Sequence, residues 1–354
     1  LWYIFVIDYF IGFPKEYIFI FSCIILVIFF FYALDKRRNS CNLNVYVWLI
    51  AIILLLPLAK YIGIGFTIGD AVVSWNRWAI ELFEGTYEPM SAGYPLLYPG
   101  IWSLFYKAQG TSDIWWTSHL IMFVTPYLLI VILLKLYFHK KDLTYLFILI
   151  AALPILNIHF SVSGYMDIPV MILGLINLIL IYQADRNRNS RFYSNHIYVA
   201  LIFGGLALGT KQSGIAFLLF TLIYILYNRS RIDFGYKFYL SLFLSLGIYI
   251  SFLFIYYFDF NYSVVGNFSE LNQLSQLVDV LTLITNLITN DKYRYVIPFL
   301  FLGSFVYFLS IFFVIFKNKY NSLYFFTRLC LLFIIVGSVF WSLFLSYDLR
   351  NLIW

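Results

Sequence analysis

The chain has 354 residues, of which 63% are hydrophobic and only 11% are charged, and its mean hydropathy is +0.87. A soluble domain cannot bury so much apolar surface, and stretches of about 18 or more apolar residues are typical of membrane-spanning helices. A transmembrane β-barrel would instead show short strands of alternating polarity, a pattern that is missing here. The composition therefore predicts an all-α polytopic membrane protein.

The net charge of +6 comes from Lys and Arg in short loops between apolar runs, so it indicates membrane orientation and not nucleic-acid binding. The Cys and His residues are scattered without metal-ligand spacing, so we expect inert thiols and no dedicated zinc site. Because the chain starts at Leu1 instead of Met and ends just beyond an apolar run, we expect a piece of a longer protein.

The apolar runs predict a single domain over residues 1–354 with about ten or eleven transmembrane helices. Leu1–Phe13 has the composition of the end of an earlier span, and ten runs follow it: 17–34, 43–62, 117–138, 143–160, 168–182, 197–208, 215–227, 238–258, 295–316 and 325–345. The runs at 197–208 and 215–227 are short and flank Gly209–Gly214. Glycine favours a break there, so we expect two helices that meet in a tight turn, or one broken helix.

Threading these spans alternately through a membrane places most basic residues on one side. By the positive-inside rule that side is cytoplasmic, and it carries Lys36, Arg37, Arg38, Lys140, Lys141, Arg186, Arg188, Arg191, Arg229, Arg231, Lys237, Lys317 and Lys319. The opposite, external side receives most of the acidic residues and two longer loops, residues 63–116 and 259–292.

The first external loop contains a segment with the pattern of an amphipathic helix. One helical face carries Ser74, Arg77, Glu81 and Glu84, and another carries Val72, Trp75, Ala79 and Leu82. Such a helix is expected to rest in the membrane interface. The segment 94–100, Tyr-Pro-Leu-Leu-Tyr-Pro-Gly, is then expected to break the chain, since neither proline can donate a backbone hydrogen bond.

Four polar islands converge on the predicted external side: Asp70, residues 163–169, residues 210–212 and residues 346–350. Ionisable side chains at membrane depth are costly, so they usually face a cavity or a partner and are candidates for function. Each also has a simpler interpretation. Asp70 and Asp167 could cap helices, Lys211 could extend to the interface, and Arg350 could anchor the chain or pair with Asp348 in solvent.

The islands and their flanking residues carry a resemblance to a known family. In order, the chain contains Gly-Asp-Ala-Val-Val-Ser-Trp-Asn-Arg-Trp-Ala, Tyr-Pro-Leu-Leu-Tyr-Pro, Gly-Tyr-Met-Asp-Ile-Pro, Thr-Lys-Gln-Ser-Gly and Tyr-Asp-Leu-Arg-Asn-Leu. This set, over residues 68–352, resembles the GT-C glycosyltransferases. Those polytopic enzymes use lipid-phosphate sugars and include protein O-mannosyltransferases and the aminoarabinose transferase of lipid A. The chain departs from the family at Ala71, where a second acid is frequent.

The resemblance implies a GT-C-like helix bundle in the plasma membrane, expected to be the bacterial inner membrane, with an active site that faces the periplasm. It also implies an inverting transfer of a sugar from a polyprenyl-phosphate donor to a hydroxyl group of a glycan, lipid or protein acceptor. A positioned carboxylate can remove the proton of that hydroxyl, and Asp70 is the candidate general base. Lys211 and Arg350 are candidates to stabilise the departing phosphate.

The remaining candidates have supporting roles. Asp167 could orient the acceptor or the sugar, or could share a divalent cation (Mg²⁺ or Mn²⁺) with Asp70, while no other cofactor is expected. Candidate substrate-binding residues are Trp75, Arg77, Tyr94, Tyr98, Tyr165, Gln212 and Asp348. Interface anchoring explains the aromatic residues of this set equally well.

Two other classes of protein are compatible with the same sequence. A lipid-linked sugar flippase or transporter would use polar groups at the bilayer midplane, often with inverted repeats. The break at Lys211 fits this class weakly, but no repeat is visible and the acids cluster at one face. A non-catalytic membrane assembly subunit would depend on the aromatic surfaces and would tolerate loss of Asp70 and Lys211.

Overall fold

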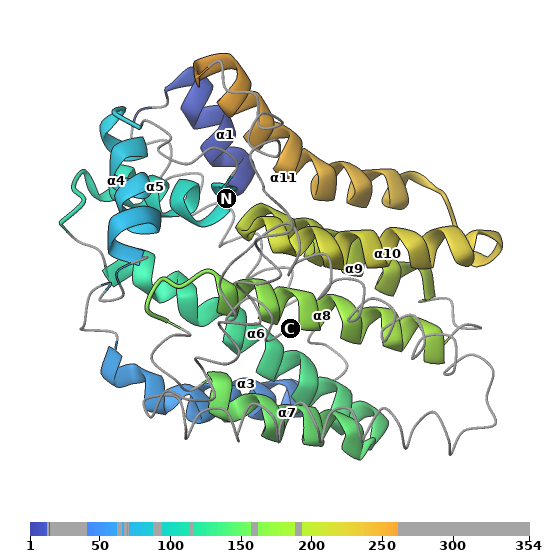
Figure 1. The fold of residues 1–354 in the computed structure, drawn as a ribbon. Helices are drawn as coiled ribbons and strands as arrows, with labels where there is room; N and C mark the ends of the chain where they lie inside the picture. The colour runs from blue at the N-terminus through green and yellow to red at the C-terminus, as the bar shows by residue number, and fades with distance from the viewer. Residues whose placement is uncertain are drawn as a thin grey trace, which may run out of the picture.

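The computed structural model describes residues 1–12, 14, 41–61, 66, 69, 71–87, 94–113, 116–156, 162–187 and 193–260, and every regular element in this part of the chain is helical (Figure 1). Three of the described helices are long and apolar enough to cross a membrane: His119–Lys140, Asp167–Arg186 and Tyr236–Ile255. The prediction of a helical chain with membrane-length segments is therefore confirmed for the described residues. The total of ten or eleven spans stays a prediction, since the runs at 17–34, 295–316 and 325–345 lie outside them.

The described residues form a series of α-helices. In chain order they are α1 (Trp2–Ile11), α3 (Cys41–Leu55), α4 (Asn76–Glu84), α5 (Leu97–Gln109), α6 (Trp116–Lys140), α7 (Leu143–Leu156), α8 (Asp167–Arg186), α9 (Tyr193–Thr210), α10 (Ile215–Tyr227) and α11 (Tyr236–Phe260). Tighter 3₁₀ turns lie at Leu56–Tyr61, Gln212–Gly214 and Arg229–Arg231, and a π-helical turn at Ala71–Trp75 precedes α4.

Helix α9 lies at the centre of one group of helices, where it packs against α8, α10 and α11. A second group forms around α6, which packs against α3, α7 and α8. The short helices α4 and α5 pack on each other, and α1 joins α5 to α11 (Figure 1). Buried residues of α1, α3, α5, α6, α8 and α11 share one continuous apolar core, so the described helices form one bundle.

The interrupted segment at 209–214 is a helical hairpin, as the glycines indicated. Lys211 leaves α9 in an extended conformation, with φ −156° and ψ 151°, and α10 then runs back along α9. A Cβ atom on Gly214 would lie 2.1 Å from the Ala207 carbonyl oxygen, and one on Gly204 would lie 3.0 Å from the Cα of Leu218. The absence of side chains at both glycines is therefore what allows the two helices to approach so closely.

The prediction that residues 94–100 break the chain is wrong for residues 97–100, which form the first turn of helix α5. The helix begins at Leu97 and includes Pro99 in its first turn. The first four backbone N–H groups of a helix have no partner within it, so a proline there costs no helical hydrogen bond. The chain break is confined to residues 94–96.

The predicted amphipathic helix forms, but its buried face differs from the predicted one. Trp75, Trp78 and Ala79 are buried, whereas Val72 is 47% exposed. The π-helical turn at Ala71–Trp75 explains the difference, because its i→i+5 bonding rotates the residues before α4 away from regular α-helical phase. Arg77 and Glu84 are exposed, as predicted.

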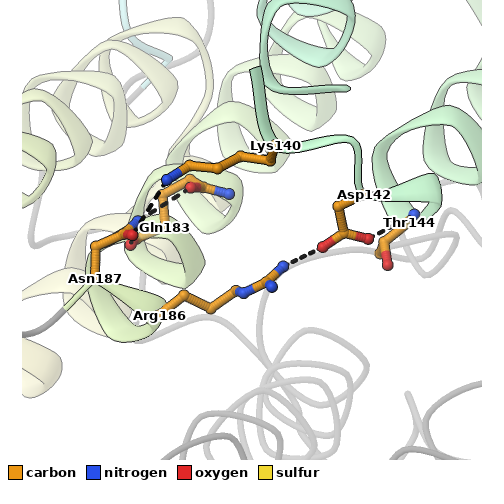
Figure 2. Close-up of polar contacts among 6 residues, drawn as sticks. All are labelled: Lys140, Asp142, Thr144, Gln183, Arg186 and Asn187. Atoms are coloured by element: carbon orange, nitrogen blue, oxygen red, sulfur yellow. Dashed lines mark hydrogen bonds and ion pairs between the residues drawn. The ribbon is translucent and has the colours of Figure 1, made fainter. Parts of the chain in front are cut away.

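One end of the bundle gathers the described basic loops, and we call it the basic end. Arg186, at the end of α8, pairs with Asp142 in the α6–α7 connection, and Lys140 donates to Asn187 at 3.3 Å (Figure 2). In the α10–α11 connection, the backbone N–H of Asp233 donates to Ser194 at the start of α9. The ends of α6 and α8 and the α10–α11 connection therefore lie at the same end of the bundle, on the right of Figure 1, as the alternate threading expects. The membrane topology itself stays a prediction.

Two neighbours stabilise the charged form of Asp142 at the basic end. Burial alone would raise the pKa of this carboxyl group, but hydrogen bonds from Thr144 and the ion pair with Arg186 lower it below its ordinary value. Arg186 also stacks over the Tyr182 ring at 5.7 Å. Water still reaches the Arg186–Asp142 pair, since the Arg186 side chain is 43% exposed.

Candidate functional site

Two of the four polar islands, residues 163–169 and residues 210–212, adjoin each other at the end of the bundle opposite the basic end, which we call the far end. A Cβ on Gly164 would lie 2.8 Å from the Cβ of Ala71, so the loop before α8 packs against the residue that follows Asp70 in the sequence. Gly164 has φ +88°, a conformation that favours glycine. A Cβ on Gly209 would lie 3.6 Å from the Cβ of Leu97, which joins the end of α9 to the start of α5.

A largely buried ion pair joins these two islands. The Nζ of Lys211 lies 2.7 Å from the Oδ1 of Asp167, and the two side chains are 11% and 12% exposed. Lys211 occupies the extended residue between α9 and the Gln212–Gly214 turn, and Asp167 is the first residue of α8. Because both charges have lost most of their water, the pair carries a desolvation cost that a surface pair avoids.

The geometry argues against the simpler interpretations of Lys211 as an interfacial anchor and of Asp167 as a helix cap. Lys211 does not extend to solvent, because its ammonium group is held by Asp167 inside the fold. For Asp167, the residue at the N-cap of α8 is Met166, which makes no side-chain capping bond. Asp167 still benefits from the positive end of the helix dipole, since it lies in the first turn. The described contacts thus favour a charged site over a helix cap or an interfacial anchor.

The predicted aromatic residues lie mainly in the core. The ring centroids of Trp75 and Trp78 are 5.0 Å apart, and Tyr94 lies 5.6 Å from Trp75 in an edge-on arrangement. Trp75 and Trp78 are 3% and 5% exposed and are therefore packing residues, whereas Tyr94 is the partly exposed member of the cluster. Tyr98 is also buried and packs against Trp102.

The other predicted residues fall into three groups: those next to the ion pair in the sequence, one on an exposed helix face, and those outside the described residues. Gln212 follows Lys211 and is half-buried, and Tyr165 lies two residues before Asp167 and is 6% exposed. Arg77 is instead on the exposed face of α4, where it pairs with Glu81 one turn later. Asp70, Asp348 and Arg350 lie outside the described residues. Within the described part of the chain, no group of three His, Cys, Asp or Glu side chains could hold a metal ion.

Two polar contacts were not anticipated from the sequence. Lys107 on α5 pairs with the buried Asp8 on α1 at 2.6 Å. The Nδ2 of Asn177, fully buried on α8, donates to the Ala200 carbonyl at 2.6 Å and to the Thr221 hydroxyl at 2.7 Å. An acid or amide inside an apolar run is the signal that could have identified both, because such a group requires a partner.

The sequence matches no protein-family model, no curated protein and no solved structure.

Proposed function

We propose that the chain is an integral, multi-pass membrane glycosyltransferase of the GT-C type, with ten or eleven spans. It would transfer a sugar from a polyprenyl-phosphate donor to an acceptor hydroxyl on the external face, with inversion. The expected location is the bacterial inner membrane, with the basic end in the cytoplasm and the far end at the periplasmic surface.

The observation that supports this proposal most strongly is the buried Lys211–Asp167 pair at the far end. Helix α8 has 20 residues and separates Asp167 from Arg186 by about 30 Å, close to the thickness of a hydrocarbon core. Buried charges near a membrane surface, opposite the basic loops, suit a reaction between a lipid-linked donor and a water-soluble acceptor.

The proposed chemistry assigns one task to each charge. The acceptor oxygen attacks the anomeric carbon while Asp70 takes its proton, and the bond from that carbon to the phosphate oxygen breaks. The polyprenyl phosphate leaves with the electron pair, and Lys211 and Arg350 stabilise its charge. Asp70 directly precedes Ala71, which packs against the loop of Asp167, and this adjacency supports a shared site.

A transporter fits these helices less well. Helix α9 has 18 residues, or about 27 Å, between the basic end and Lys211, so the hairpin turn lies near one face and not at the midplane where transporters bind their cargo. The pair supports an assembly subunit less than an enzyme, because hydrophobic residues of similar volume often stabilise a fold as well as a buried ion pair does.

The test is sugar transfer by the purified chain in lipid nanodiscs, with a radiolabelled polyprenyl-phosphate sugar and an acceptor panel. We expect transfer by the native chain and a loss of about 10²–10⁴-fold in turnover for Asp70→Asn. Glu84→Gln, an exposed acid on α4, is the matched control and retains turnover. Unchanged turnover in Asp70→Asn would show that Asp70 is not the general base. Movement of labelled lipid across the bilayer without formation of a glycosidic bond would favour the transporter.

A further inference from the structure

The cation of the candidate site already has a partner. Lys211 and Asp167 form a 2.7 Å ion pair in which both side chains are close to nine-tenths buried. An anion that approaches Lys211 therefore meets an ammonium group whose charge is balanced, and it must compete with the carboxylate for it. The strength of that competition becomes part of the affinity of the site.

The two partners lie in different backbone settings. Lys211 is part of the hairpin turn, where its backbone N–H donates to Ala207 at 3.2 Å and Gly214 packs directly on the α9 backbone. Its position is thus fixed by main-chain packing. Asp167 lies in the first turn of the 20-residue helix α8, where the positive end of the helix dipole stabilises a carboxylate even without a cation. A carboxylate that leaves Lys211 is consequently not left uncompensated.

Resting on the proposed function, we infer that Asp167 is an exchangeable counter-ion for Lys211. When the site is empty, Asp167 holds the ammonium group in place and balances its charge. The donor's phosphate displaces the carboxylate from Lys211, because a phosphate group offers the ammonium more acceptor oxygens in a charge-assisted contact. After transfer, Asp167 returns to Lys211 and assists release of the polyprenyl phosphate. Asp167 is thus a positioning residue, and neither a base nor a metal ligand.

Binding of a polyprenyl monophosphate tests this inference without requiring sugar transfer. The affinities of the monophosphate and of the matching polyprenol are measured for the native chain in nanodiscs, for Asp167→Asn and for the double variant Lys211→Met/Asp167→Asn. We expect Asp167→Asn to bind the monophosphate about tenfold tighter or more, which corresponds to the loss of one competing interaction. Polyprenol affinity stays unchanged. The double variant loses the preference for the phosphate.

Equal or weaker phosphate binding by Asp167→Asn would overturn the exchange. If Asp167→Asn does not fold, infrared difference spectra of the native chain decide the question. A change in carboxylate bands on addition of the monophosphate, but not of the polyprenol, supports exchange, and the absence of such a change overturns it. The two proposals fail separately. If the native chain transfers no sugar but Asp167→Asn still binds the monophosphate more tightly, only the glycosyltransferase proposal is refuted. If the native chain transfers sugar but Asp167→Asn leaves the monophosphate affinity unchanged, only the exchange is refuted.

Discussion

Two ion pairs, each between residues 44 positions apart, lie at opposite ends of helix α8. At the basic end, the side chains of Arg186 and Asp142 are 43% and 20% exposed, whereas those of Lys211 and Asp167 at the far end are 11% and 12% exposed. An exposed pair contributes little to stability and costs little, while a buried pair costs desolvation that an apolar replacement would avoid. This difference in exposure suits the proposed function, in which the basic end sets orientation and the far-end pair has a chemical task.

The largest expected effect is the difference in the free energy of unfolding between two glycine-to-alanine variants, one at Gly214 in the hairpin turn and one at Gly235 near the basic end. Gly214→Ala places a Cβ 2.1 Å from the Ala207 carbonyl oxygen, and the helix backbone there cannot yield cheaply. We expect a loss of about 2–3 kcal/mol in the free energy of unfolding. At Gly235, near the basic end, the nearest atom is 3.3 Å away on the Asp233 side chain. Gly235→Ala should cost about 0.5 kcal/mol or less. Unfolding in mixed micelles measures both, and equal losses would contradict the comparison.

A second prediction concerns Asn177, which ties α8 to the α9–α10 hairpin between the two ends. Its amide donates to the Thr221 hydroxyl at 2.7 Å inside the bundle. A double-mutant cycle with Asn177→Leu and Thr221→Val should give a coupling energy of about 0.6 kcal/mol, the average for such bonds between membrane helices, and at most about 1.7 kcal/mol. A coupling energy near zero would mean that α8 and the hairpin keep their register without this bond.

The smallest effect is expected at the basic end and depends on pH. The pKa of Asp142 is lowered in the folded chain, so its carboxylate stabilises the fold above its ordinary value of about 3.9. This contribution is lost as the pH falls through the folded-state pKa. Asp142→Asn should therefore be less stable than the native chain at pH 7, by up to about 1 kcal/mol, and this deficit should be smaller at pH 3. Unfolding at the two pH values measures this, and a difference that grows in acid would be inconsistent with the lowered pKa.

The helices of this chain were largely predictable, because apolar runs and punctuating charges are local features of the sequence. The run at 215–227 has the same bounds as α10, and α7 begins at Leu143 as predicted. Helix α5 was missed, since Pro99 suggested a break although a proline in the first turn is harmless. The π-helical turn before α4 has no sequence signature, and the buried face of the amphipathic segment was therefore assigned wrongly at Val72.

For the candidate site, the sequence predicted only which residues lie on the same side of the bundle, and not which of them are in contact. Alternate threading placed Lys211 and Asp167 at the same end, but it could not show that they pair. That contact depends on the Gly214 packing that sets the position of the turn. Threading likewise could not distinguish buried Trp75 from a residue that lines the site, because tertiary packing decides exposure. The assignments of Asp70 and Arg350 stay predictions.

The most direct test of the central claim compares the removal of each ion pair in the sugar-transfer assay. Lys211→Met/Asp167→Asn and Arg186→Met/Asp142→Asn each remove both charges, so neither variant leaves an uncompensated charge behind. The account predicts that the far-end variant loses about 10²–10³-fold in kcat, while the basic-end variant stays within about twofold of the native chain. Equal losses in the two variants, or full activity without Lys211 and Asp167, would contradict it.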